Sequence, residues 1–251
     1  MSRTYTAALV IIGDEILSGR TQDKNVAQIA QWLNVQGIRL SEVRVVADVE
    51  DAIIEAVNAL RQRNDYLFTT GGIGPTHDDI TVDAIAAALG VPVVVHPEAE
   101  RMLRNYYASI EKEATPARMS MARVPQGAGL IDNPVSGAPG IMIENIYIMA
   151  GIPHITAGML EGLTGTLEGG RPLVSVTVGA FSPESEVADL LRAVVKAHPD
   201  VALGSYPFFK EGRYGSNFVM RAEGEEAAAA CAEDLAGRLR AAGYDPTVGG
   251  L

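Results

Sequence analysis

A glycine-rich stretch followed by two acidic residues is the part of this sequence best suited to chemistry. Residues 70–81 read TGGIGPTHDDIT. Glycines leave no side chain between a ligand and the backbone, and free N–H groups at the start of a helix attract phosphate oxygens. The carboxylates of Asp78 and Asp79 would repel a bare phosphate, so they fit such a site only with a divalent cation between them and the phosphate. The stretch therefore predicts a site for a phosphorylated ligand and a metal, although a glycine-rich turn with an acidic helix cap fits the local pattern equally well.

The elements on either side place this stretch on a turn from a strand to a helix. Before it, residues 66–70 form a short β-prone apolar run, which predicts a buried strand. After it, apolar residues recur at helical spacing over 82–89. Thr76 and Asp79 have the spacing of a capping box, which predicts that the helix begins near residues 78–81.

A second acidic pair follows another predicted strand. Residues 7–12 are an unbroken apolar run, typical of a central parallel strand, and Gly13, Asp14 and Glu15 come directly after it. Open α/β sheets bind their ligands at the carboxyl ends of the strands. This acidic pair is therefore expected at the ligand-binding edge.

The alternation of strands and helices predicts the fold of the first part of the chain. Three strand–helix units follow one another, which is the signature of a parallel sheet covered on both faces. The predicted strands are 7–12, 39–46 and 66–70, and the predicted helices lie around 26–33, 48–60 with Asp48 as cap, and 78–89. Further along we predict a strand at 91–95, a polar helix over 98–113, a short segment at 117–123 and a hairpin of 141–143 with 146–149. Loops of small residues at 131–140 and 150–153 flank this hairpin and can bring backbone close to a ligand.

The pattern changes after residues 168–172, which predict a linker. From residue 171 to residue 251 the predicted order is strand, helix, strand, strand, helix and a last strand, which suggests a small split βαβ module of the ferredoxin-like or KH-like kind. The module has no stacking set of aromatics on one strand and no basic stripe, so RNA is not an expected partner. We interpret it as a packing or dimerising appendage to a domain of residues 1–170.

Composition narrows the functional classes. The chain has 251 residues, of which 47% are apolar, and a formal net charge of −11. This charge argues against nonspecific binding to nucleic acid or to an anionic membrane. Cys231 is the single cysteine, which excludes a disulfide framework, and neither a signal peptide nor a membrane-spanning stretch is recognisable. We therefore expect a cytoplasmic enzyme or binding protein.

Four motifs in a fixed order resemble one family. They are Gly13-Asp14-Glu15, the stretch from Thr70 to Thr81, Asn133 with Gly137-Ala138-Pro139-Gly140, and Gly151-Ile152-Pro153. In this order they are similar to the molybdopterin-binding (MogA/MoaB-like) domain in its competence/damage-inducible CinA form. The similarity is close over residues 7–170, and the appendage with its Gly-Ser-Tyr-Pro turn at 204–207 extends it nearly to the end of the chain. The resemblance implies a three-layer α/β/α sandwich with a mostly parallel sheet, followed by the small α+β module, in a protein that is usually oligomeric.

The chain departs from the family pattern in three places. Ser136 precedes Gly137 where the family often has Gly-Thr-Ala-Pro-Gly, so the threonine hydroxyl is missing and a serine lies beside its place. The Lys-Gln pair that often precedes a proline in the family is absent, and Arg118 and Arg123 are the nearby cations. The sequence ends after the appendage, so we expect a short form without the nicotinamide-mononucleotide deamidase domain.

The resemblance also implies roles for the motif residues. CinA-type members resemble metal-dependent pyrophosphatases acting on ADP-ribose or FAD-like dinucleotides, whereas MogA-like relatives bind molybdopterin and adenylylate it. In both cases Mg²⁺ or another divalent metal would be held by Asp14, Glu15, Asp78 and Asp79, with Asp14, Asp78 and Asp79 as the catalytic residues. The phosphate and the base or pterin would contact Gly13, Thr70, Gly71, Gly72, Gly74, Pro75, Thr76, Thr81, Asn133, Ser136, Gly137, Ala138, Pro139, Gly140, Gly151 and Pro153.

Three functions stay open at this point. The first is a metal-dependent pyrophosphatase acting on a dinucleotide, and the second is a molybdopterin-binding or adenylylating protein. The third is a noncatalytic nucleotide-binding scaffold. Each takes a phosphorylated small molecule as its partner and needs neither nucleic acid nor a membrane, and each is expected in a homo-oligomer.

Overall fold

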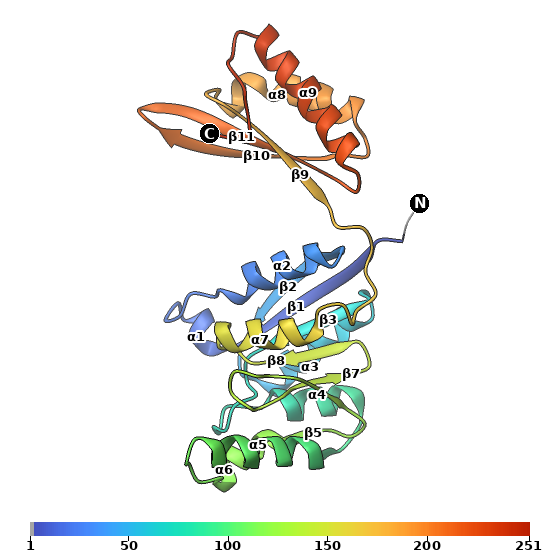
Figure 1. The fold of residues 1–251 in the computed structure, drawn as a ribbon, viewed down its shortest axis with the longest axis vertical. Helices are drawn as coiled ribbons and strands as arrows, with labels where there is room; N and C mark the ends of the chain where they lie inside the picture. Colours follow the sequence, from blue (N-terminus) through green and yellow to red (C-terminus); the bar gives the residue numbers. More distant parts are fainter. Residues whose placement is uncertain (1–2) are drawn as a thin grey trace. The chain divides into compact units, whose positions relative to one another are not determined.

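The chain folds into two compact units, residues 1–170 and 171–251. A computed structural model describes residues 3–251, and each unit has its own sheet and its own hydrophobic core (Figure 1). None of the helices in this described range is long and apolar enough to cross a membrane.

A six-stranded sheet lies at the centre of the N-terminal unit. Its strands, in spatial order, are β2 (Ile38–Val46), β1 (Tyr5–Ile12), β3 (Tyr66–Thr70), β8 (Ile146–Met149), β7 (Gly140–Ile143) and β6 (Gly129–Ile131). The first four run parallel to one another, β7 runs antiparallel to β8, and β6 runs antiparallel to β7. The predicted mostly parallel sheet and the predicted hairpin of β7 with β8 are confirmed. Strand β6 was not predicted, because three residues are too few to form a recognisable pattern.

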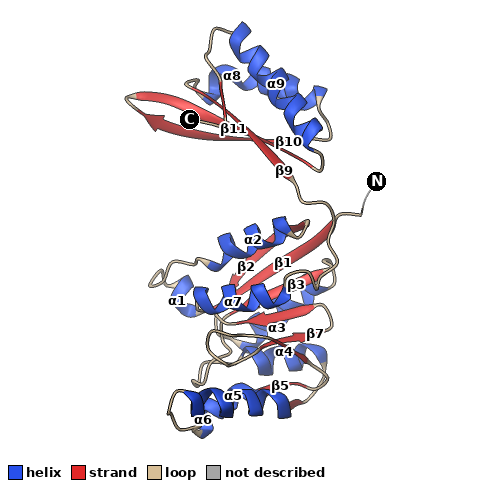
Figure 2. Cartoon of the chain, viewed as in Figure 1, coloured by secondary structure: helices blue, strands red, loops and turns tan. Residues whose placement is uncertain are grey.

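Helices cover both faces of this sheet, so the unit is a three-layer α/β/α sandwich as predicted (Figure 2). One face is covered by α2 (Asn25–Val35) and α7 (Pro153–Leu163), and the other by α3 (Glu50–Arg61) and α4 (Thr81–Leu89). Neighbouring residues of β1 point to opposite faces. Leu9 belongs to the core beneath α2 and α7, and Val10 to the core beneath α3 and α4; both are fully buried. Burial on both faces explains why this strand is apolar along its length.

A small substructure follows α4. It consists of β4 (Val93–Val95) paired with β5 (Arg123–Pro125), together with α5 (Pro97–Ser109), α6 (Pro116–Met119) and the short 3-10 helix η1 (Ser120–Ala122). The helix predicted over 98–113 ends at Ser109, because the chain turns into the left-handed conformation at Glu111 (φ +54°). The predicted segment 117–123 is helical up to Ala122, and its last residue begins β5. We call residues 97–122 the α5–α6 segment.

The C-terminal unit is an antiparallel sheet with two helices packed on one face. Its strands, in spatial order, are β10 (Ala202–Lys210), β11 (Arg213–Ala222), β9 (Val174–Ala180) and β12 (Thr247–Val248). The helices α8 (Glu184–Ala197) and α9 (Glu225–Ala241) cover an apolar core in which Cys231 is buried. The predicted split βαβ order is confirmed.

Gly71, the first residue after β3, is a position where the sheet depends on a missing side chain. Its φ is +101°, and a Cβ here would lie 2.1 Å from the carbonyl oxygen of Ile12 in β1. Gly71→Ala is therefore expected to lower the free energy of unfolding of the N-terminal unit by roughly 2–4 kcal/mol, from backbone strain and steric overlap together. The measurement is urea unfolding followed by the fluorescence of Trp32, the single tryptophan, which lies in α2.

Gly90→Ala is the matched control for this substitution. Gly90 also has a positive φ (+69°), but nothing lies within 4 Å of the Cβ that would be added. Only the backbone strain, about 1–2 kcal/mol, is then expected. Equal losses of stability in the two variants would contradict the close contact with Ile12 as the cause.

Candidate functional site

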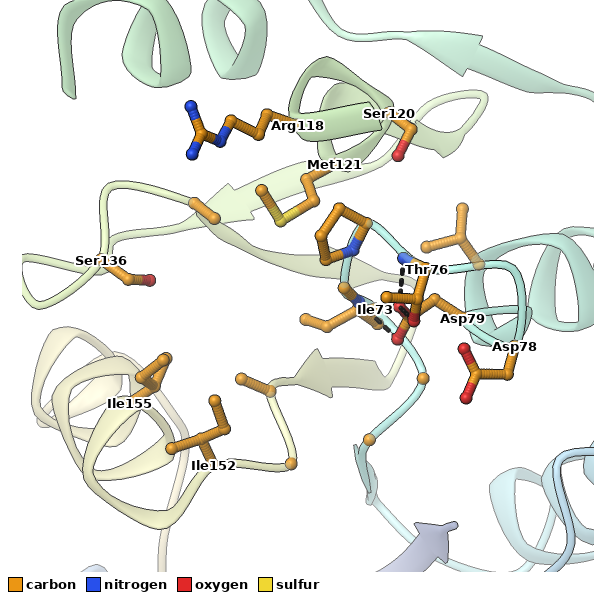
Figure 3. Close-up of a pocket in the computed structure, with 18 of the residues that line it drawn as sticks. Ile73, Thr76, Asp78, Asp79, Arg118, Ser120, Met121, Ser136, Ile152 and Ile155 are labelled. Carbon is orange, nitrogen blue, oxygen red and sulfur yellow. Dashed lines mark hydrogen bonds between the residues drawn. The ribbon is translucent and has the colours of Figure 1, made fainter. Parts of the chain in front are cut away.

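A cavity of about 960 Å³ opens at the carboxyl ends of β1, β3 and β8 (Figure 3). Residues that follow each of these strands line it: Gly13 and Glu15 after β1, residues 71–80 after β3, and residues 150–153 after β8. Parallel neighbours end at the same edge of a sheet, so the topology itself brings these loops together. The α5–α6 segment contributes a further wall.

The carboxylate of Asp79 holds the glycine-rich stretch in one shape. It accepts hydrogen bonds from the backbone N–H groups of Gly74 (2.7 Å) and Thr76 (2.7 Å) and from the Thr76 hydroxyl (2.5 Å). Figure 3 shows such bonds as dashed lines. α4 begins at Thr81, within the predicted range of 78–81, but the predicted capping box is wrong, because Ile80 takes the N-cap position and no side chain caps the helix. Asp79 instead closes the loop ahead of the helix.

Two of the three glycine amides in the stretch are already bonded within the protein. The N–H of Gly71 donates to the carbonyl oxygen of Met149 (3.2 Å), and the N–H of Gly74 donates to Asp79. No acceptor for the N–H of Gly72 is present among the residues that the structure describes. The glycine turn therefore offers a phosphate one of the three amides predicted to hold it.

Thr70 and Thr81, both predicted to contact the ligand, are buried behind the turn. Their exposed fractions are 1% and 0%. The Thr81 hydroxyl donates to the carbonyl oxygen of Gly71 (2.9 Å), and the Thr81 N–H donates to that of Gly72 (3.0 Å). Neither threonine lines the cavity. In this structure Thr81 fixes the turn against α4, and the ligand contacts predicted for the two threonines stay predictions.

The acidic residues of the two motifs lie at the same edge of the sheet. Glu15 and Asp78 line the cavity, and so does Asp48, which follows β2. The prediction that Asp48 caps α3 is wrong: Val49 takes the N-cap position, and Asp48 accepts a hydrogen bond from the backbone N–H of Asp14 (2.9 Å). Asp48 was not among the predicted site residues, although its place at the end of a predicted parallel strand was a usable signal.

These carboxylates do not form a ready-made metal site. Within residues 3–251, no three His, Cys, Asp or Glu side chains come close enough together to hold a metal ion. Asp79 is engaged by the turn, and Asp14 does not line the cavity. The neighbouring Thr76, then the backbone N–H of Asp78 itself and then His77 lower the pKa of the Asp78 carboxyl below its ordinary value. Asp78 therefore carries its negative charge at neutral pH.

The loop of residues 132–139 forms another wall, and Asn133 shapes it from within. Asn133 is buried, and its side-chain amide donates to the hydroxyl of Ser136 (2.7 Å) and to the carbonyl oxygen of Ala138 (2.7 Å). Ser136 and Ala138 line the cavity, but Asn133 does not. Asn133 therefore holds the loop, and its predicted contact with a base or pterin stays a prediction.

The wall formed by the α5–α6 segment was not predicted. Tyr106 and Tyr107 of α5 line the cavity, with their ring centroids 5.4 Å apart. Gly137 packs against the first ring, since a Cβ there would lie 2.3 Å from an atom of Tyr106. The other residues of this wall are Ile110, Lys112, Arg118, Ser120 and Met121, and Arg123 of β5 also lines the cavity. The signals for this wall in the sequence were two consecutive tyrosines in a helix expected to be polar and the cations near the place of the missing Lys-Gln pair.

Most of the predicted ligand-binding residues come together in this cavity. Those that line it are Gly13, Gly71, Gly72, Gly74, Pro75, Thr76, Ser136, Ala138, Pro139, Gly151 and Pro153. Those that do not line it are Thr70, Thr81, Asn133, Gly137 and Gly140. Of the predicted metal ligands, Glu15, Asp78 and Asp79 line it and Asp14 does not. The arrangement suits a large organic ligand with polar groups.

Similar proteins are known for both units. Residues 8–169 match the family described as "Probable molybdopterin binding domain", and residues 172–247 match "FAD synthase, middle domain". A protein of Pyrobaculum calidifontis is 37% identical over 212 residues, which are 80% of each chain. A CinA-like protein of Desulfosudis oleivorans is 34% identical over 245 residues, which are 92% of this chain and 57% of that protein. The crystal structure of the protein CinA, of unknown function, from Thermoplasma acidophilum matches with a TM-score of 0.59 at 30% identity, over 64% of this chain and 96% of that one.

Asp79→Ala is expected to loosen the glycine turn, because it removes the acceptor of three hydrogen bonds. Hydrogen exchange at the amides of Gly74 and Thr76, measured by NMR, should become roughly tenfold faster or more. The N-terminal unit should lose about 1–3 kcal/mol of unfolding free energy. Asp78→Ala is the matched control, since it removes the adjacent carboxylate and leaves these bonds in place. Unchanged protection in Asp79→Ala would contradict the role given to this carboxylate.

Proposed function

Because the chain belongs to the family described as probable molybdopterin binding domains, we propose that its cavity binds a phosphorylated heterocyclic compound and hydrolyses the pyrophosphate bond of an ADP-ribose- or FAD-like dinucleotide. The observation that carries this proposal is the size of the cavity. Its volume of about 960 Å³ is near the upper end of the range for small-molecule sites, so it suits a dinucleotide better than a single nucleotide. The family matches of both units support a pterin- or nucleotide-type ligand.

The apolar part of the lining suits a flat ring. Figure 3 shows Ile73, Met121, Ile152 and Ile155 around one space. Apolar side chains of this kind bury the faces of a heterocycle, and a few polar groups at the rim set its orientation. These residues therefore bind and position the ligand, while the reacting phosphates lie toward the polar rim.

The proposed reaction needs a divalent cation that enters with the ligand. The protein has no ready-made cluster for it within the described residues, but Mg²⁺ is commonly held by one or two carboxylates together with phosphates of the substrate. Glu15 and Asp78 are the motif carboxylates that line the cavity and are not engaged by the turn. The cation would offset the negative charge of the phosphates.

A molybdopterin-binding or adenylylating protein is the second candidate, and the match of residues 8–169 favours it. A noncatalytic nucleotide-binding scaffold is the third.

A homo-oligomer in the cytoplasm belongs to the same proposal, and light scattering of the purified protein tests the oligomeric state. Because the chain spans 57% of the CinA-like relative, the activity of a whole protein of that kind also stays a proposal.

Incubation with ADP-ribose or FAD and Mg²⁺ is expected to release AMP, detected by chromatography, and EDTA should abolish the release. Asp78→Ala should lower kcat/KM by roughly tenfold or more, because it removes a charged cavity carboxylate. Glu161→Ala removes an exposed carboxylate of α7 outside the cavity and should leave the rate unchanged.

Other outcomes of the same incubations separate the candidates. Adenylylated pterin formed from molybdopterin and ATP would support the second candidate. Saturable binding without any turnover would support the third. AMP release that is insensitive to both EDTA and Asp78→Ala would contradict the proposed hydrolysis at this site.

A further inference from the structure

The rim of the cavity carries negative charge from three strand ends. Glu15, Asp48 and Asp78 line the cavity after β1, β2 and β3. A phosphate placed beside these carboxylates would be repelled, because like charges a few ångströms apart interact strongly in a partly dry site. The glycine turn compensates little, since Asp79 already accepts from the N–H groups of Gly74 and Thr76. When no divalent cation is bound, the ligand's phosphate therefore needs a positively charged side chain of the protein as its partner.

The α5–α6 segment and β5 supply three cations to the lining, Lys112, Arg118 and Arg123. Arg123 is paired with Asp83 at 2.5 Å, so its charge is largely balanced within the protein. No acidic side chain in the described part of the chain pairs with Arg118 or Lys112. Lys112 lies exposed in the loop after α5, which leaves Arg118 as the cation with a defined position.

Two contacts hold the guanidinium of Arg118 in place. One of its N–H groups donates to the backbone carbonyl oxygen of Glu113 (2.6 Å). The group also lies over the ring of Tyr107, 4.8 Å from the ring centroid. A guanidinium has five N–H donors in a rigid fork, so most of them remain for a ligand. An arginine fixed in this way loses little conformational freedom when it binds an anion.

We propose that Arg118 binds a phosphate group of the ligand. Figure 3 shows Arg118 and Asp78 on opposite sides of the pocket, with Ile73 and Met121 between them. The ligand therefore lies across the cavity, with its ring on the apolar residues and a phosphate at the wall of the α5–α6 segment. This inference rests on the proposed function, and it makes the cavity selective for a phosphorylated heterocycle over the same compound without phosphate.

AMP and adenosine are the probes for this inference, because they differ by one phosphate. We expect isothermal titration of the full chain in EDTA at pH 7 to show AMP binding roughly tenfold or more tightly than adenosine, since a hydrogen bond to a charged group has a strength of this order. Arg118→Gln should remove most of that preference and leave the affinity for adenosine within about twofold. Arg118→Lys, which retains the charge without the fork, should restore part of it.

Arg104→Gln is the matched control, because it also replaces an arginine of the α5–α6 segment by glutamine. The side chain of Arg104 is paired with Glu100 and does not line the cavity. The AMP preference should be unchanged in this variant, and an equal loss in Arg104→Gln would overturn the specific role of Arg118. Equal losses of AMP and adenosine affinity in Arg118→Gln would also overturn it, since Arg118 would then act by shaping the wall through Tyr107. If the wild-type protein binds none of AMP, adenosine and ADP-ribose, the proposed function fails and the inference fails with it.

Discussion

Three hydrogen bonds to one carboxylate hold the part of the molecule on which the site depends. Asp79 accepts from two backbone amides and one hydroxyl of the loop that follows β3, and so the protein itself sets the shape of the glycine turn. Behind the turn, the hydroxyl of Thr81 reaches the carbonyl oxygen of Gly71, and Gly71 lies too close to β1 to carry a side chain. The turn is therefore a preformed floor for the cavity. As a consequence, the Asp79 carboxylate and the backbone N–H groups of Gly74 and Thr76 are bonded to one another and are not available to a ligand.

Contacts with the charged parts of a ligand must therefore come from other side chains of the cavity. The carboxylates left at the rim come from the ends of three neighbouring strands, and the positive charge comes from a segment inserted between β4 and β5. A ligand that carries both an apolar ring and an anionic phosphate matches this division of charge, because each part then meets a complementary surface. Nucleotides and phosphorylated pterins both have this character, so this division of charge does not distinguish the two classes of candidate ligand.

The sequence predicts those features that have a single local cause. Residues 7–12 are apolar throughout because both faces of β1 are buried, and the motifs at 13–15 and 70–81 reach one edge because β1 and β3 are parallel neighbours. The sequence does not show which polar groups form hydrogen bonds within the protein itself. Asp79 and Asn133 have the chemistry of ligand contacts, yet each satisfies its own loop. Residues such as Tyr106, Tyr107 and Arg118 reach the cavity only through the packing of a segment far along the chain, which no local pattern specifies.

We propose that the cavity at the carboxyl edge of the sheet is the binding site for a phosphorylated ligand, with a phosphate at Arg118. The most direct test is a crystal structure of the protein soaked with ADP-ribose and Mg²⁺. We predict density for the ligand between the glycine turn and the α5–α6 segment, with a phosphate oxygen within hydrogen-bonding distance of the Arg118 guanidinium. Ligand density at another place on the protein, or an empty cavity at a concentration that saturates binding in solution, would contradict it.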